Sequence, residues 1–114
     1  MNDKIDNINE RKIRNDSINL HININELVDL NQFPDILKNQ SHEEAKLTFE
    51  LLYKTNNHSL INKAGKAGGF TALHWMCIKN EYELIEYLIE KFDVEINCKA
   101  EMGETPLLIC IRFL

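Results

Sequence analysis

Apolar side chains recur with the period of an α-helix along residues 81–92. Four of them follow at i, i+1, i+4 and i+5, namely Leu84, Ile85, Leu88 and Ile89. This spacing puts the four on one stripe, so we expect a helix that buries this face in the core. Polar positions lie between them, and the simplest interpretation is a solvated face made by Glu81, Glu83, Glu86 and Glu90.

Two helices are predicted before this stripe. Pro34 suits a first helical turn because that position needs no N–H donor, and a short helix is expected over residues 34–39. Ser41 and Glu44 then form the S-x-x-E pattern of a capping box. The apolar residues that follow crowd more than one side, so the pattern predicts a helix over residues 43–54 that is buried on several sides.

The middle of the chain is predicted as a loop followed by another helix. The pair Asn56-Asn57 and the glycines Gly65, Gly68 and Gly69 supply turn chemistry in residues 55–70. Thr71 can cap a helix over residues 72–79, whose apolar Trp75 and Met76 are expected in the core. Asn80 tolerates left-handed backbone geometry and suits the turn into the next helix.

The sequence repeats itself with a period of about 34 residues. The segment GFTALH at 69–74 recurs as GETPLL at 103–108, so that Thr71 and Thr105 are 34 residues apart. The dipeptide Ile61-Asn62 recurs as Ile96-Asn97, which is 35 residues later. Two signals at nearly one period, with helix, turn, helix and loop in between, indicate a repeat architecture.

These segments resemble the ankyrin-repeat family. That family's pattern is Gly-x-Thr-Pro-Leu-His, a turn of small residues, a second helix with a leucine pair, and a Val-Asn-like dipeptide. The matching motif residues, expected to be structural, are Gly69, Thr71, Leu73, His74, Gly103, Thr105, Pro106 and Leu107. The chain departs from the pattern at Ala72, Asn80, Phe92 and Leu108. The resemblance implies an all-α solenoid of helix–turn–helix repeats, short and truncated at the C-terminus.

We expect four segments along the chain. An Asn- and Ile-rich leader, expected to be disordered, covers residues 1–23, and a degenerate N-terminal capping repeat covers 24–61. An ankyrin repeat follows over 62–97, and a partial repeat with its loop and first helix covers 98–114. The last helix has no second helix to cover it. We expect Leu107 or Leu108 together with Ile111 to pack on the preceding repeat. The rest, with Phe113 and Leu114, is expected to lack a cover and to drive self-association.

Charge argues against two classes of partner. The net charge is −5, from 13 basic and 18 acidic side chains, and no basic cluster occurs. Nucleic acid is therefore not expected as a partner, since contacts to phosphate supply most of that affinity. No apolar run is long enough for a bilayer, and the N-terminus lacks a signal peptide, so a cytoplasmic protein is expected. The Asn- and Ile-rich composition also raises the hypothesis of a microbial protein delivered into a host cell.

Candidate chemistry is sparse. The cysteines Cys77, Cys98 and Cys110 form no CxxC pair, and reduced structural thiols are the preferred interpretation. His74 with Cys77 would give a metal ion only two ligands. Cys77 with His58 or His74 could pair a nucleophile with a base, but no third orienting group or oxyanion hole is visible. Gly65-x-x-Gly68-Gly69 lacks the lysine of a phosphate-binding loop. We expect no catalytic, cofactor or metal site; His74 is expected to bond Thr71 and nearby backbone.

The resemblance implies a protein-interaction module. In the family, loop tips and the inner face of the first helices hold partners, and the matching positions are Phe70, Ile78, Lys79, Glu101, Met102, Glu104 and Arg112. Phe70 and Met102 are the leading candidates because nothing in the fold is expected to need them. Two alternatives stay open, a regulatory fragment of a larger enzyme and a truncated or decayed reading frame without independent activity.

Overall fold

The structure is a computed structural model that describes residues 31–113. The predicted leader over 1–23, the first residues of the predicted capping repeat and Leu114 lie outside the described residues. The described elements run in the order η1 (Asp35–Asn39), α3 (His42–Lys54), η2 (His58–Asn62), α4 (Ala72–Ile78), α5 (Tyr82–Lys91) and α6 (Pro106–Arg112). All six are helical, which confirms the predicted all-α class.

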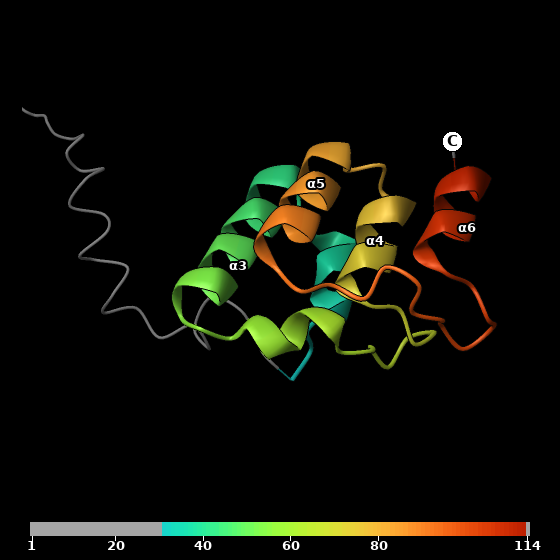
Figure 1. The fold of residues 1–114 in the computed structure, drawn as a ribbon, viewed down its shortest axis with the longest axis horizontal. Coiled ribbons are helices and arrows are strands. Elements are labelled where there is room, and N and C mark those ends of the chain that lie inside the picture. The colour runs from blue at the N-terminus through green and yellow to red at the C-terminus, as the bar shows by residue number, and fades with distance from the viewer. Residues whose placement is uncertain (1–30, 114) are drawn as a thin grey trace, which may run out of the picture.

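Helix α4 is the centre of the packing. It contacts α5, α6, η1 and η2, and α3 packs against α5. In Figure 1 the helices stand next to one another from α3 to α6, and the loops gather along one edge below them. Because neighbours surround α4, every residue from Ala72 to Cys77 is buried. This one short helix therefore supplies a large part of the core.

The hydrophobic core is continuous from η1 to α5. Its buried members are Phe33, Leu37, Ala45, Phe49, Leu52, Ile61, Ala72, Leu73, Trp75, Met76, Leu84, Leu88 and Phe92. None of the helices in this described part of the chain has the length and apolar character that a membrane crossing requires.

The predicted capping box starts α3. The Ser41 hydroxyl accepts a hydrogen bond from the Glu44 backbone N–H at 3.2 Å, and the Glu44 carboxylate accepts one from the Ser41 N–H at 2.8 Å. Together they satisfy two backbone donors that the first turn of a helix leaves free. The helix begins one residue before the predicted start, at His42. The predicted short helix is also present, as the 3₁₀ helix η1.

The segment predicted as one long loop contains a helix. Residues 55–70 include η2, and its Ile61 is buried in the core. The glycines and asparagines do mark turns, since Asn56, Gly68 and Gly69 all have positive φ. An apolar pair at 60–61 nevertheless has a core to pack against, and this tertiary contact stabilises a short 3₁₀ turn that composition alone does not reveal.

The stripe predicted on α5 is narrower than expected. Leu84 and Leu88 are buried and Ile85 is half-buried, but Ile89 is 45% exposed. The helix has neighbours only on the side that faces α3 and α4, so the outer edge of the stripe stays in solvent. The expectation that Ile89 is a core residue was wrong. The turn before α5 is as predicted, because Asn80 adopts φ 57°.

Helix α6 buries a different face from the one predicted. Pro106 and Ile109 are buried against the preceding repeat, whereas Leu107, Leu108 and Ile111 are exposed at 64%, 51% and 58%. The expectation that one of the leucines packs together with Ile111 was wrong. Pro106, which follows the Thr105 cap, and Ile109 are three residues apart and therefore share the inward face.

Candidate interaction surface

His74 joins two repeats with one buried side chain. Its Nδ1 accepts a hydrogen bond from the Thr71 backbone N–H at 3.1 Å, so its Nε2 carries the proton and donates to the Glu104 carbonyl oxygen at 2.9 Å. The Thr71 hydroxyl in turn accepts from the His74 backbone N–H. These contacts are the bonds to Thr71 and to nearby backbone that the sequence analysis expects of His74. The described residues include no group of three potential ligands that could hold a metal ion.

The second copy of the motif makes only one of the two capping hydrogen bonds. Thr105 accepts a hydrogen bond from the Leu108 backbone N–H at 3.3 Å, and Pro106 occupies the first helical turn. The Leu108 side chain has no polar atom with which to return the bond, as the His74 side chain does in the first copy. The motif residues Gly103, Thr105 and Pro106 thus start α6 as Thr71 starts α4, while Leu107 projects outward.

The tips of successive loops are tied together. The Glu101 backbone N–H donates to the Gly68 carbonyl oxygen at 3.0 Å, and Gly69 stands so close that an added Cβ would lie 3.1 Å from that nitrogen. Within the second tip, the N–H of Ala100 donates to the Glu104 oxygen at 2.8 Å. These bonds hold a closed turn with Met102 at its outer end.

A second pair of hydrogen bonds joins successive loops, between Asn62 and residues 93–95. The Asn62 side chain donates to the Asp93 carbonyl oxygen at 3.0 Å and accepts from the Glu95 backbone N–H at 2.8 Å. The sequence analysis noted Asn62 only as part of a repeated dipeptide. The same dipeptide recurs at Ile96-Asn97, and a structural role for Asn62 could have been inferred from this repetition.

The periodic helices, the paired caps and the linked loops are those of a repeat array, and a family model described as ankyrin repeats (3 copies) matches residues 37–113. The chain belongs to the ankyrin-repeat family. No curated protein and no solved structure matches it. Ankyrin repeats in general mediate protein–protein interaction and are typically not catalytic.

The predicted partner residues of this ankyrin-repeat chain fall into two groups. Glu101, Met102 and Arg112 are exposed, and Met102 is the most exposed large apolar residue described, at 85%. Glu104 is mostly buried, and its carboxylate pairs with Arg112 at 3.0 Å. Glu101 and Met102 lie at the second loop tip, and Glu104 and Arg112 pair beside α6.

The other three are built into the fold. The ring of Phe70 lies edge-on to Trp75, with centroids 5.2 Å apart, and 5.6 Å from the ring of His74. Ile78 is likewise half-buried against the core. Lys79 donates from Nζ to the carbonyl oxygens of Leu37 and Gln40.

The expectation that nothing in the fold needs Phe70 was therefore wrong. The residue stands beside a helix whose aromatic side chains it covers. Lys79 donates hydrogen bonds to carbonyl groups at the end of η1, a position where helices favour a positive charge.

The outer helices carry a contact that the sequence analysis missed. His42 Nδ1 lies 2.6 Å from Glu81 Oε1, and His42 Nε2 lies 3.1 Å from Glu83 Oε1. The hydrogen bond to Glu81 raises the pKa of His42, with smaller contributions from the charges of Glu81, Glu43 and Glu83. Glu81 is thus a partner of α3, which corrects its assignment to a solvated face. Residues 39 apart in sequence gave no local signal of this contact.

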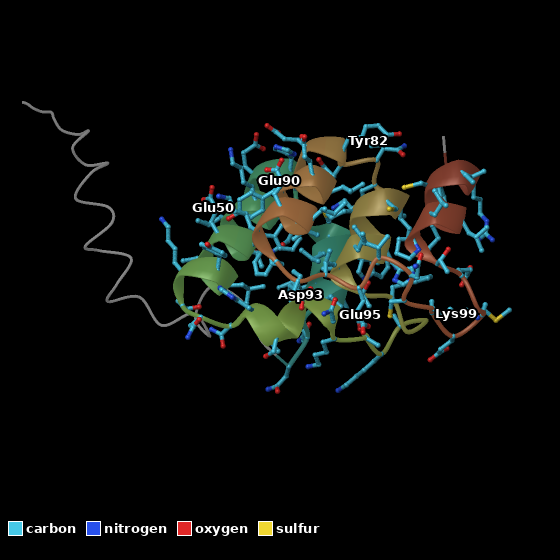
Figure 2. All side chains as sticks on the ribbon, in the orientation of Figure 1. Glu50, Tyr82, Glu90, Asp93, Glu95 and Lys99 are labelled. Atoms are coloured by element: carbon cyan, nitrogen blue, oxygen red, sulfur yellow. The ribbon has the colours of Figure 1, made fainter. Side chains whose placement is uncertain are left out.

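Acidic side chains gather outside α3 and α5. Figure 2 shows Glu50 and Glu90 beside these two helices, and Asp93, Glu95 and Lys99 along the loop that leads to α6. A shallow groove between the helices is lined by Lys46, Glu83, Leu84, Glu86, Tyr87 and Glu90. Burial raises the pKa of the Tyr87 hydroxyl, and the nearby charge of Glu50 adds to the effect.

Proposed function

We propose that the chain is a protein-binding module that holds its partner at the second loop tip and the adjoining face of α6. The observation that carries this proposal is the exposure of Met102, whose side chain is 85% accessible at the end of a hydrogen-bonded turn. An exposed apolar side chain costs free energy in water, and a partner that covers it recovers that cost.

The backbone around Met102 favours binding. The bonds from Glu101 to Gly68 and from Gly103 to Ala100 hold the turn in one shape before a partner arrives. A preorganised loop loses less conformational entropy on binding than a free one. Methionine itself is flexible and polarisable, so it adapts to an apolar pocket of the partner.

Charged groups border this apolar contact. Glu101 is exposed next to Met102, and Arg112 forms an ion pair with Glu104 on the adjacent α6. A polar rim around an apolar centre is the usual anatomy of a protein interface. The net charge of −5 favours neither nucleic acid nor an anionic membrane as the partner. We place this binding in the cytoplasm, in keeping with three free cysteines.

The test compares Met102→Ala with a matched control. Proteins captured by the immobilised wild-type chain are identified, purified and titrated against the variants by calorimetry. We expect Met102→Ala to weaken binding by about tenfold, because it removes the central apolar contact. Ile89→Ala serves as the control, since Ile89 is an exposed apolar residue on the outer helix α5.

Two results would contradict the proposal. In the first, Met102→Ala binds every captured protein as tightly as the wild type does. In the second, Ile89→Ala weakens binding as much as Met102→Ala, which would move the interface to the outer helices.

A further inference from the structure

Cys77 of α4 and Cys110 of α6 lie on helices that run side by side in the same direction. Each helix begins after a threonine cap, Thr71 for α4 and Thr105 for α6, and both start from the loop edge of the molecule (Figure 1). The two helices are in direct contact. A residue of one helix therefore meets residues at the same height on the other.

Two hydrogen bonds fix that height. Near the starts of the helices, His74 Nε2 donates to the Glu104 carbonyl oxygen at 2.9 Å, and near their ends Asn80 Nδ2 donates to the Phe113 carbonyl oxygen at 3.1 Å. Cys77 precedes Asn80 by three residues, and Cys110 precedes Phe113 by three. Each cysteine thus lies in the last turn of its helix, just before the residue that makes this bond, so the two stand at similar heights.

Cys77 is buried on α4, and Cys110 on α6 is its neighbouring thiol. Burial, with a smaller contribution from the interaction with Cys110, raises the pKa of Cys77 well above its ordinary value. Cys110 is only half-buried, so its thiol is more accessible to solvent and small molecules than that of Cys77.

We propose that Cys77 and Cys110 form a thiol–disulfide site, in which a low-molecular-weight disulfide oxidises the pair to an intramolecular bond that ties α6 to α4. The Cys110 thiolate attacks one sulfur of the small disulfide, which forms a mixed disulfide and releases one thiol. The Cys77 thiolate then attacks the Cys110 sulfur and releases the second thiol. Both protein thiols lose their protons, and the two electrons reduce the small disulfide to two thiols.

The order of the two steps follows from access and acidity. Cys110 reacts first because it is the thiol that the oxidant can reach. Cys77 is shielded from the oxidant but lies next to the mixed disulfide, so its attack is intramolecular. Its raised pKa keeps the reactive thiolate scarce, and we expect the second step to accelerate as the pH rises.

Cys98 provides an internal comparison. It is also half-buried, and burial raises its pKa, but it lies on the loop beside Glu95, Ile96 and Asn97. The site differs from the proposed partner surface in its chemistry, because oxidation of the two thiols requires neither Met102 nor a protein partner. A cytoplasmic disulfide of this kind would be transient and would report the redox state.

The experiment uses the folded 114-residue chain with oxidised glutathione as the oxidant. Intact mass, free-thiol counting and mapping of linked peptides follow the reaction, and thermal unfolding is recorded before and after reduction. We expect a Cys77–Cys110 linked peptide, a mass lower by two hydrogen atoms, and a melting temperature raised by about 5–10 °C, since the bond closes a long loop. Cys98→Ser should behave in the same way, and Cys110→Ser should form no internal disulfide.

Three outcomes would overturn the proposal. One is a stable glutathione adduct on Cys110 that leaves Cys77 free at high pH. Another is an internal disulfide that includes Cys98. The third is a folded chain whose Cys110 does not react at all. Because peptide mapping is done on the wild-type chain, none of these outcomes depends on whether a cysteine variant folds.

Discussion

The His74 imidazole lies 2.9 Å, through Nε2, from the backbone oxygen of Glu104, a residue 30 positions later in the chain. The same ring accepts a hydrogen bond from the Thr71 N–H, three positions earlier. One buried side chain therefore starts α4 and also holds the loop that leads to α6. The local cap and the contact between repeats cannot be separated, and a single substitution removes both.

Replacement of His74 by alanine should destabilise the chain by at least about 1 kcal/mol, because it breaks the cap and leaves the Glu104 oxygen without its donor. Urea unfolding followed by circular dichroism measures the loss. Lys99→Ala is the control, since that side chain is exposed. A melting temperature that rises by many degrees with zinc would instead indicate that His74 is a metal ligand.

The contact between His42 and Glu81 should make stability depend on pH. The folded chain raises the pKa of His42 above its ordinary value of 6.5. The stabilisation that this contact gives the folded chain is therefore fully present below about pH 6.5. It is lost as the pH rises through the pKa that His42 has in the folded chain. We expect the difference in melting temperature between the wild type and His42→Gln to shrink from pH 6 to pH 9. A difference that grows over this range would contradict the assignment.

Replacing Phe70 or Met102 by alanine should have different effects on the free energy of unfolding. Phe70 packs on Trp75 and His74, so its loss should lower the free energy of unfolding by about 1–3 kcal/mol. Met102 is 85% exposed, so its loss should change stability by no more than about 0.5 kcal/mol. Chemical denaturation of the two variants in parallel is the measurement. Equal losses would mean that the turn around Met102 is packed more tightly than its exposure indicates.

The exposed apolar face of α6 should make the 114-residue chain self-associate. Leu107 and Ile111 are four residues apart and 64% and 58% exposed, with Leu108 beside them. Lysine at both positions 107 and 111 should give a monomer by sedimentation velocity at a concentration where the wild type associates. The control is Ile89→Lys, on the exposed side of α5. A wild-type chain that stays monomeric at high concentration would rule out this interface.

The sequence predicted the features that depend on local chemistry. The S-x-x-E box at Ser41, the Thr71 cap, the left-handed Asn80 and the 34-residue repeat are each written in a few neighbouring residues or in their repetition. These were enough to predict the all-α class and the family that the match over residues 37–113 confirms.

The candidate surface was predictable only in part. Repetition of the motif points to the loop tip, and Met102 stands there with nothing to pack against. Phe70 and Lys79 occupy equally variable positions of the motif. Phe70 packs on Trp75, and Lys79 donates to the carbonyl oxygens of Leu37 and Gln40, so both side chains are part of the fold. Such contacts are specific to this chain rather than to the repeat.

The tertiary structure alone decided which side of each helix is covered and which distant residues meet. The periodicity of the sequence identified the apolar positions of α5 and α6. Which of them are buried depends on which neighbouring helices cover them, and this leaves Ile109 inside and Ile89 exposed. The pairs His42–Glu81 and Cys77–Cys110 join residues 39 and 33 positions apart. Each pair forms because two helices share one register, and that register is set by packing over the whole array rather than by residues near either partner.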